Sequence, residues 1–572
     1  MKELKGLPVS PGIAIGKAYI YHPFSCEVPE AHFPPEEALH YYEMYQLALH
    51  TAAEELDAMI AHLEAQGNDK SLIFEAHKEI LEDEELLEET AAAILDETCM
   101  PDYAVASTFE RFAGILENAA DPLIAARAAD LYDVKNRLVR ILHGEKERNL
   151  SMLHENVIVV AQDLLPSDTA TMDKEHVLAI VTQTGSATSH SAIIANSYAI
   201  PAVLGVADVT SILYDGAAAA VDALEGRVYL EPDAPTLAHL EQKQAQYRAQ
   251  ASELLKFRSV PCVLRSGEPL QIGLNIGSAD YQDAYAYVDF VGLMRSEFLY
   301  MQAQSMPSEQ TQYNAYVRVL RHANGKPVTL RTLDIGGDKT LPYLQLPHEE
   351  NPFLGNRALR FCLEHSELFR TQLRAALRAS AEGPLQLMFP MVGSMDDIYA
   401  AKAAVRQVQQ ELLAEGIAFD AQIKLGIMIE IPAIAEIADL AAREVDFASV
   451  GSNDLVQYLC ASDRMNPAVT PYYQSFSPAV FRVLARVISA FRAAGKPVSV
   501  CGELAGNPLA APILAGLGLE KFSMSAASIA PVKKALMQFS LEELRTLANA
   551  AVGASTQKAV MELAEAALHG KE

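Results

Sequence analysis

The chain has 572 residues, of which 50% are hydrophobic and 21% are charged, and its formal net charge is −29. This length predicts about three or four domains, and the composition is that of a globular protein and not of a disordered one. The negative charge argues against nucleic acid or an anionic membrane as the main partner, although a locally basic pocket could still bind a small anionic substrate.

The six cysteines are scattered singly, which indicates neither a disulfide framework nor a zinc site. The first residues lead into no apolar segment of the signal-peptide type. The longest uncharged stretch, 177–207, contains His190, Asn196 and Pro201, which is the wrong composition for a membrane span. We therefore expect a cytoplasmic protein without membrane insertion.

The first 260 residues predict an α/β domain that is interrupted by helices. Residues 4–22 are β-like, and short β-type runs return at 156–160 and 177–181. Between them, Gly and Pro become rare and apolar residues recur at helical spacing, which is typical of a helical bundle. The predicted boundaries are 1–34 with 145–232 for the α/β domain, 35–144 for the inserted helical domain and 233–260 for a linker helix.

From residue 261 to 572, short apolar runs alternate with helical stretches. The eight runs are Gln271–Leu274, Val288–Gly292, Val328–Leu333, Leu385–Phe389, Lys424–Ile429, Phe447–Val450, Val498–Val500 and Phe522–Met524. This is the number of strands that a (β/α)8 TIM barrel needs. Because such barrels carry their active sites at the carboxyl ends of the strands, the polar residues that follow these runs are candidates for function.

The segment 185–194 follows the predicted strand 177–181 and predicts a tight turn and the start of a helix, with His190 in its first turn. A helix N-terminus favours anions and a neutral imidazole, so His190 in the first turn could accept a phosphoryl group. Thr188, Ser189 and Ser191 would add hydroxyl donors. A lone histidine is more often structural, so the motif by itself leaves both interpretations open.

The barrel supplies a candidate anion site. Arginines occur at separate strand ends and loops, at Arg295, Arg331, Arg357, Arg360 and Arg464, and arginine suits bidentate binding of phosphate or carboxylate. Glu430 and Asp454 each follow a strand, and two carboxylates without a Cys or His cluster suit Mg²⁺ shared with a phosphorylated substrate. Residues 336–339 are a weak phosphate-loop signal. Cys501 is predicted to end a strand at the same face.

These motifs, in this order, resemble Enzyme I of the bacterial sugar phosphotransferase system, the phosphoenolpyruvate–protein phosphotransferases. The resemblance covers essentially the whole chain. The matching motifs are Ser10–Ala14, Thr188–Ala192, Gly292–Leu299, Arg331–Lys339, Asn351–Arg357, Met428–Pro432, Gly451–Tyr458, Asp463–Arg464 and Val500–Glu503.

The resemblance implies that His190 takes the phosphoryl group of phosphoenolpyruvate and passes it to a histidine of the small carrier protein HPr, with release of pyruvate. This is the first step of coupled sugar uptake and phosphorylation. Cys501 would donate a proton to the product, and Glu430 and Asp454 would hold Mg²⁺. Substrate binding would fall to Arg295, Arg331, Arg357, Asn453, Asp454 and Arg464, with support from Thr188, Lys339 and Glu503.

The family also implies a homodimer through the barrel, a swivelling His190 domain and docking of HPr on the helical domain. An acidic surface would attract a basic carrier. The expected contacts are Glu75, His77, Glu82 and Glu84 along one helix, with Arg127 and Asp130 from another. For any single Glu in the acidic run 79–89, a solvated helix face is the ordinary explanation.

The chain departs mildly from the family pattern, at Ser186, Ala187, Ser296, Asn356, Ser452 and Leu504, and no charged catalytic position is affected. Three alternatives remain. ATP-using dikinases and synthases need a large ATP-grasp domain, and no Gly-rich nucleotide loop precedes His190. A nitrogen-regulatory paralogue would usually carry a sensor domain ahead of Leu4. A non-catalytic acidic scaffold would not need the complete set of Arg, Glu, Asp, Cys and His side chains.

Overall fold

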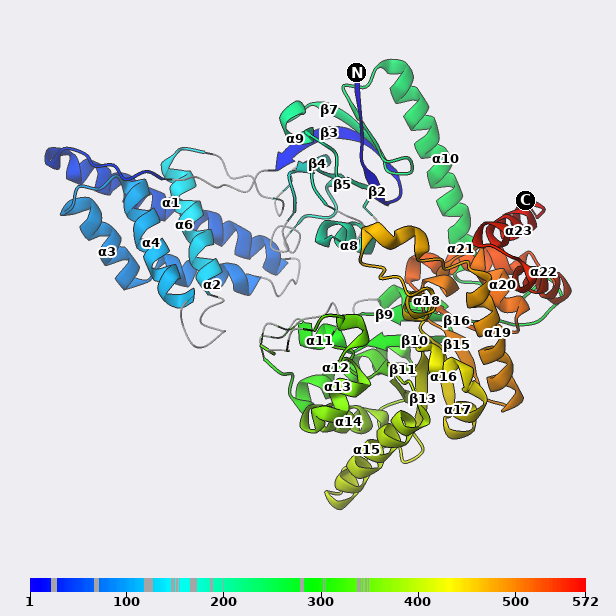
Figure 1. The fold of residues 1–572 in the computed structure, drawn as a ribbon. Helices are drawn as coiled ribbons and strands as arrows, with labels where there is room; N and C mark the ends of the chain where they lie inside the picture. The colour runs from blue at the N-terminus through cyan, green and yellow to red at the C-terminus, as the bar shows by residue number, and fades with distance from the viewer. Residues whose placement is uncertain are drawn as a thin grey trace. The chain divides into compact units, whose positions relative to one another are not determined.

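The computed structural model shows a chain that divides into two compact units, residues 1–250 and 251–572 (Figure 1). Each unit is described separately. The structure describes all residues except 22–27, 66–70, 118–126, 146–149, 151–152, 154, 165–171, 186–188, 199, 278–281, 302, 304, 337–340, 342, 345–346, 348 and 572.

The first unit contains an eight-stranded mixed sheet in the order β1-β8-β7-β3-β4-β5-β6-β2. The strands are β1 (Lys2–Lys5), β2 (Leu7–Ser10), β3 (Ile13–Tyr21), β4 (Val157–Ala161), β5 (Val177–Thr182), β6 (Ala202–Leu204), β7 (Ala218–Asp222) and β8 (Arg227–Leu230), with helices α8 (His190–Ser197) and α9 (Val209–Ile212). Strand β4 is buried along its whole length and pairs in parallel with β3 and β5, as its continuous apolar sequence predicts. Strand β3 ends at Tyr21 and β4 begins at Val157, so the two paired strands lie on either side of the inserted helices in the sequence. This confirms the predicted insertion of a helical bundle into an α/β unit.

The inserted helices are α1 (Ala38–Ala65), α2 (Ser71–Leu81), α3 (Glu84–Leu95), α4 (Pro101–Glu117) and α6 (Ala128–Leu142). Along α1, buried side chains recur three or four residues apart at Tyr45, Ala48, Ala52, Leu56 and Met59. This spacing gives the helix one apolar face, which packs in a single core with apolar residues of α2, α3, α4 and α6.

The acidic segment of this bundle differs from the prediction. Glu75 and His77 lie on α2, but that helix ends at Leu81, and Glu84 begins α3. The Asp83 carboxylate accepts a hydrogen bond from the Leu86 N–H at 3.0 Å, which caps the new helix. The expectation of one helix carrying all four residues from Glu75 to Glu84 is therefore wrong.

The predicted linker helix is present as α10 (Ala234–Arg258). In the first unit, the Gln244 side chain of α10 donates to the Ile13 carbonyl at 2.7 Å. In the second unit, the buried Lys533 amine donates to the carbonyls of Arg258, Val260 and Tyr287 at 2.9–3.1 Å. Polar contacts thus hold the middle of the helix, at Gln244, and its last residue, Arg258.

The second unit is a closed barrel of eight parallel strands, which confirms the predicted fold (Figure 1). The strands are β9 (Gln271–Ile276), β10 (Phe290–Arg295), β11 (Val328–Arg331), β12 (Leu385–Phe389), β13 (Lys424–Ile429), β14 (Phe447–Val450), β15 (Val498–Val500) and β16 (Lys521–Met524). Seven of them overlap the predicted runs closely. Strand β10 begins later, because the Asp289 carboxylate accepts the Ile272 N–H, and it continues to Arg295, which pairs with Arg331.

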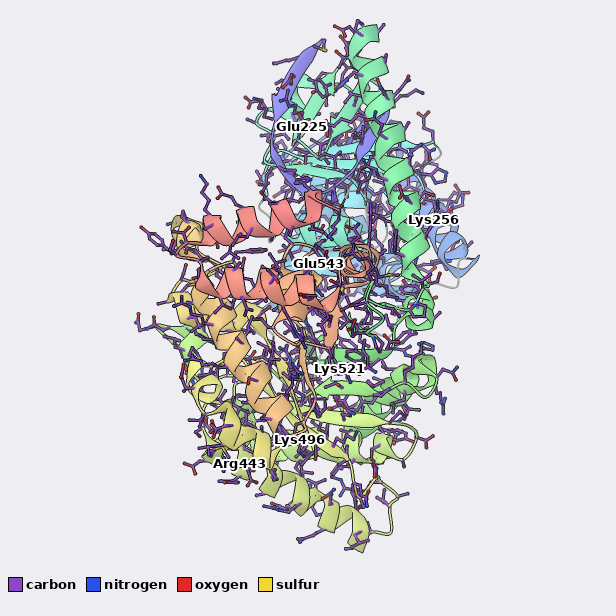
Figure 2. The ribbon with its side chains drawn as sticks, turned by 90° about the vertical axis from the view of Figure 1, so that its right-hand side faces the viewer. Glu225, Lys256, Arg443, Lys496, Lys521 and Glu543 are labelled. Atoms are coloured by element: carbon purple, nitrogen blue, oxygen red, sulfur yellow. The ribbon has the colours of Figure 1, made fainter. Side chains whose placement is uncertain are left out.

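Helices surround the barrel: α11 (Glu297–Met301), α12 (Glu309–Ala323), α13 (Leu359–Glu364), α14 (Ser366–Ser380), α15 (Met395–Ala414), α16 (Pro432–Glu436), α17 (Ala438–Glu444), α18 (Ser452–Cys460), α19 (Pro478–Ala493), α20 (Ala510–Gly516), α21 (Ala526–Met537), α22 (Leu541–Gly553) and α23 (Gln557–His569). Glu543 of α22, labelled in Figure 2, accepts hydrogen bonds from Lys571 and Arg265 and so ties the last helices to the barrel. The bond from Lys571 is the main reason that the pKa of Glu543 falls to about 2.

The barrel interior follows from the alternation of side chains along each strand. Ile427 and Ile429 of β13 point outward into the main core, whereas Met428 points inward, where it packs with Phe447 and Cys501. Among the described residues, no helix is both long enough and apolar enough to span a bilayer.

Substitution of Leu56 by alanine should destabilise the helical bundle by about 2–5 kcal/mol, because this side chain is fully buried. The matched variant Leu47→Ala removes a leucine from the same helix that is 66% exposed, and it should cost less than about 0.5 kcal/mol. Hydrogen–deuterium exchange of the α1 and α4 amides in the full chain measures the free energy of opening. Equal effects of the two substitutions would contradict the packing described here.

Candidate active site

A cavity of about 380 Å³ lies at the carboxyl ends of the barrel strands. Its lining includes eight residues predicted from the sequence: Arg295, Arg331, Arg357, Glu430, Asn453, Asp454, Arg464 and Cys501. They come from the ends of five strands, from the loop before α13 and from the loop after α18. Parallel strands bring their carboxyl ends together, so residues more than 200 positions apart meet in one cavity.

Two of the arginines are buried and share one carboxylate. Arg331 ends β11, pairs with Glu297 and lies 3.2 Å from Asp334, measured from Nη1 to Oδ2. Arg357 donates to Asp334 Oδ1 from Nη2 at 2.9 Å. Although burial alone would lower the pKa of Arg331, the charges of Glu297 and Asp334 raise the pKa above its ordinary value. Both guanidinium groups therefore stay charged and fixed in place.

A second set of contacts positions the outer arginine. Arg464 Nη1 donates to Asp454 Oδ1 at 3.1 Å, and Arg357 Nη1 lies 3.7 Å from the same oxygen. The Phe353 ring lies 5.6 Å from each guanidinium carbon. Asp454 and Phe353 thus hold two arginines on one side of the cavity, while Arg295 is exposed.

Glu430 is a fully buried carboxylate that follows β13. Its Oε1 accepts the Met391 N–H at 2.6 Å, which Met391 presents from a left-handed conformation with φ of 55°. Its Oε2 is buried without a hydrogen-bond donor among the described residues. Burial, together with the charges of Asp454 and Asp334, raises the pKa of Glu430 to about 8. A carboxylate with one free oxygen among other acids is a site that favours a cation.

These carboxylates fit Mg²⁺ better than a transition metal. No cluster of three or more His, Cys, Asp or Glu side chains suited to a metal occurs in the part of the chain that the structure describes. Mg²⁺ is commonly held by only one or two carboxylates together with substrate phosphate and water. Glu430 and Asp454, which both line the cavity, are the carboxylates that could supply this donor set.

Cys501 follows β15 directly and is 4% exposed. Its Sγ donates to the Val450 carbonyl at 3.6 Å, and its own carbonyl accepts the Asn275 amide at 2.7 Å. Burial raises the pKa of the Cys501 thiol. The thiol is therefore protonated at neutral pH and faces the same cavity as the arginines.

Asn453 and Glu503 bind each other reciprocally. The Asn453 amide donates to the Glu503 carboxylate at 3.1 Å, and the Asn453 Oδ1 accepts the Glu503 N–H at 2.9 Å. This pair fixes the orientation of the Asn453 side chain, with Glu503 acting from beside the cavity and not from its lining.

Comparison with known proteins identifies the type of site. Family models described as "PEP-utilising enzyme" match residues 5–127 (N-terminal), 153–226 (mobile domain) and 251–541 (PEP-binding domain). The phosphoenolpyruvate-protein phosphotransferase of Bacillus sp. (strain S) is 43% identical, covering 98% of this chain and 97% of that protein. The protein of the same name from Bacillus subtilis (strain 168) is 42% identical and covers 98% and 99%. A solved structure described as "NMR solution structure of Enzyme I (nEIt) protein using two 4D-spectra" is 40% identical and covers 43% of this chain and 99% of its own, with a TM-score of 0.37.

The chain belongs to the phosphoenolpyruvate–protein phosphotransferase family. This confirms the resemblance that the motifs indicated. The protein is therefore a transferase that uses phosphoenolpyruvate.

The remaining candidate residues are not among the described residues that line the barrel cavity. His190 is the first residue of α8, in the first unit, where the sequence predicts a helix start, and the Ser189 side chain caps this helix by accepting the Ala192 N–H. Thr188 and Lys339 fall outside the described residues. Arg360 donates to the Leu354 and Gly355 carbonyls and lines a different cavity.

The expected HPr contacts differ in exposure. His77 is only 5% exposed and lies between the Phe74 ring and Asp130, whose Oδ1 is 3.5 Å from its Nε2. A residue so buried offers little surface to a partner. Glu82, Glu84 and Arg127 are exposed.

One residue of the site, Glu297, was missed by the sequence analysis, whereas Asp334 directly follows the predicted run Val328–Leu333 and was among the strand-end candidates. Both lie inside motifs that carry the family resemblance, Gly292–Leu299 and Arg331–Lys339. The pairing of both carboxylates with buried arginines depends on folding, and for Glu297 the motif Gly292–Leu299 was the only available signal.

The buried carboxyl of Glu430 predicts a pH effect on the metal-free protein. The folded chain keeps this proton up to about pH 8, whereas the unfolded chain releases it near pH 4.3. Barrel stability should therefore fall as the pH rises through this window, by up to about 1.4 kcal/mol per pH unit. Glu430→Gln should flatten that fall in calorimetric melting of the full chain in a chelator. The control Glu565→Gln changes an exposed carboxylate on α23 and should leave the pH dependence of stability unchanged. An unchanged pH dependence in Glu430→Gln would contradict the raised pKa of Glu430.

Proposed function

We propose that this chain transfers the phosphoryl group of phosphoenolpyruvate to His190 and then to a histidine of the carrier HPr, releasing pyruvate, as the first step of a sugar phosphotransferase system. The observation that carries the proposal is the cavity in which four arginines meet four carboxylates. Phosphoenolpyruvate carries a phosphate and a carboxylate, and arginine binds both in bidentate fashion.

The charge balance of the cavity supports a metal-dependent reaction. Glu297 and Asp334 already compensate Arg331 and Arg357, so a multiply charged substrate needs another cation. Glu430 and Asp454 would hold Mg²⁺, which would polarise the phosphoryl oxygens of the substrate. Arg295 and Arg464, at the rim, would bind and orient the substrate anions, and Asn453 would add its amide.

His190 is the proposed acceptor because of its place at the start of α8. A helix N-terminus disfavours imidazolium and stabilises an attached phosphoryl group. Transfer requires the α/β domain of residues 1–34 and 145–232 to present His190 first to the barrel cavity and then to the carrier. Thr188 would support the histidine, and Lys339 and Glu503 would support the barrel site.

Cys501 is the proposed proton donor. Loss of the phosphoryl group leaves the enolate of pyruvate, whose methylene carbon must be protonated. The thiol is buried in the cavity wall and protonated at neutral pH, whereas Glu430 and Asp454 would be ionised as metal ligands.

Incubation with labelled phosphoenolpyruvate and Mg²⁺ should place an acid-labile, base-stable phosphate on the chain. His190→Ala should lose it completely, whereas His176→Ala, in the same domain, should keep it. Labelled ATP in place of phosphoenolpyruvate should give no transfer, which separates this function from that of an ATP-using dikinase. Label that persists in His190→Ala, or comes from ATP, would refute the proposal.

We also propose a homodimer through the barrel and docking of HPr on the helical domain of residues 35–144. The exposed acids Glu82 and Glu84, at the junction of α2 and α3, are the parts of the predicted surface most open to a basic partner. Glu75 and Asp130 would contribute from the neighbouring faces of α2 and α6, and Arg127 from the start of α6.

Reversing two of these charges tests the docking surface. The double variant Glu82→Lys and Glu84→Lys should slow transfer to HPr by about tenfold at low salt, and less at high salt, because electrostatic steering is screened. Its labelling by phosphoenolpyruvate should be unchanged. The control Glu562→Lys and Glu565→Lys makes the same charge change on α23, and an equal loss of transfer in both would remove the docking role.

A further inference from the structure

A tyrosine of α18 lines a second cavity, beside the catalytic one. This second cavity has a volume of about 580 Å³, and its lining includes Phe353, Met391, Gln457 and Tyr458. The first three of these residues each contact a residue that lines the catalytic cavity. Tyr458 contacts two of those three, so it supports the catalytic cavity from behind.

The Tyr458 hydroxyl holds the loop that precedes α13. It donates to the Phe353 carbonyl at 2.6 Å, and the Met391 sulfur lies 3.7 Å from the same hydroxyl oxygen. Burial raises the pKa of Tyr458 to about 12, so the hydroxyl keeps its single hydrogen at neutral pH and remains a donor. A hydrogen bond across 105 positions of the sequence thus joins α18 to this loop.

The residue that this bond fixes is in contact with two arginines of the site. The Phe353 ring lies 5.6 Å from the guanidinium carbon of Arg357 and 5.6 Å from that of Arg464. A cation is attracted to the face of an aromatic ring at such distances. The Arg357 side chain is 1% exposed and also donates to Asp334, whereas the Arg464 side chain is 25% exposed. Arg464 therefore depends more on the ring than Arg357 does.

Helix α18 also supplies the other contacts of Arg464. Asp454 precedes Tyr458 by four residues, so both side chains lie on one face of the helix. Asp454 accepts a hydrogen bond from the Arg464 guanidinium at 3.1 Å, and the Gln457 side chain accepts the Arg464 N–H at 3.1 Å. The guanidinium group thus contacts Asp454 and the Phe353 ring, and Tyr458 ties that ring to the helix that carries Asp454.

We propose that Tyr458 is a positioning residue for substrate binding, whose hydroxyl fixes Phe353 so that the ring holds the Arg464 guanidinium in place for the anionic groups of phosphoenolpyruvate. This role rests on the proposed binding of the substrate by Arg464. Tyr458 acts through Phe353, since it lines the second cavity and not the catalytic one. An arginine that is already held in place binds an anion without the entropic cost of ordering a mobile side chain. The hydroxyl therefore affects the affinity for the substrate and not the chemical step.

The experiment compares the full chain with Tyr458→Phe, Phe353→Leu, the two substitutions together, and Arg464→Ala. Tyr458→Phe removes one hydroxyl and keeps the ring. Tyr313→Phe is the matched control, because it removes a tyrosine hydroxyl of α12 that bonds to Glu382. Pyruvate formation in a single turnover with Mg²⁺ is measured over a range of phosphoenolpyruvate concentrations. This gives the half-saturating concentration and the limiting rate separately.

Tyr458→Phe should raise the half-saturating concentration of phosphoenolpyruvate by about tenfold and leave the limiting rate within about twofold of the unsubstituted chain. Phe353→Leu should have the same effect. Adding Tyr458→Phe to Phe353→Leu should change little further, because the hydroxyl acts through the ring that is already lost. Tyr313→Phe should leave both values unchanged.

The outcomes separate this inference from the proposed function. An unchanged half-saturating concentration in Tyr458→Phe, while Arg464→Ala raises it, would overturn the role of Tyr458 alone. A normal half-saturating concentration in Arg464→Ala would overturn the proposed substrate contact and the role of Tyr458 with it. A limiting rate that falls as much as the affinity, or effects of Tyr458→Phe and Phe353→Leu that simply multiply, would also overturn the inference, since neither is expected of a hydroxyl that acts through Phe353.

Discussion

The carboxylate of Asp334 is the constraint on which the active site depends. It lies between Arg331 and Arg357 and is itself 1% exposed. Removing one member of such a buried ionic set typically costs about 3–5 kcal/mol, because the remaining charge has no water and no partner. Asp334 therefore fixes the end of β11 to the loop before α13, and the two guanidinium groups point into the cavity before any substrate arrives.

This arrangement leaves the site balanced and still receptive. Glu297 and Asp334 compensate the two buried arginines, and Asp454 contacts Arg464 and Arg357. Glu430 remains with one oxygen unused by hydrogen bonds among the described residues. The site thus favours the joint arrival of a cation and an anionic substrate over either one alone, since each would neutralise the charge that the other brings.

The barrel could be predicted because its parallel strands are buried on both sides and so form short continuous apolar runs. The late start of β10 could not be predicted, since Val288 continues the apolar run while Asp289 bonds to Ile272. The break after Leu81 was hidden for a related reason. Asp83 lies in an acidic run that looks like one helix face, and only its bond to the Leu86 N–H identifies it as a cap.

The candidate site was predictable to the extent that each strand end could be found. Arg295, Arg331, Glu430 and Cys501 each end or directly follow a strand, and parallel strands bring such ends together. The pairing of Arg331 with Glu297 was not predictable, because Glu297 meets Arg331 from 34 positions away and only after folding.

The alternation of side chains along each strand explains the position of Cys501. Going inward from the cavity, Arg331 and Glu430 give way to the apolar Met428 and Phe447. The sulfur lies at this change from charged to apolar surroundings, where a thiolate is poorly stabilised on the inner side. Ser449 and Ser499 are hydroxyls at that inner side, and the Ser499 hydroxyl donates to the Ser449 oxygen at 2.9 Å. Because these two strand positions are in register, their hydroxyls satisfy each other, and an apolar barrel interior can hold them without a buried unpaired polar group.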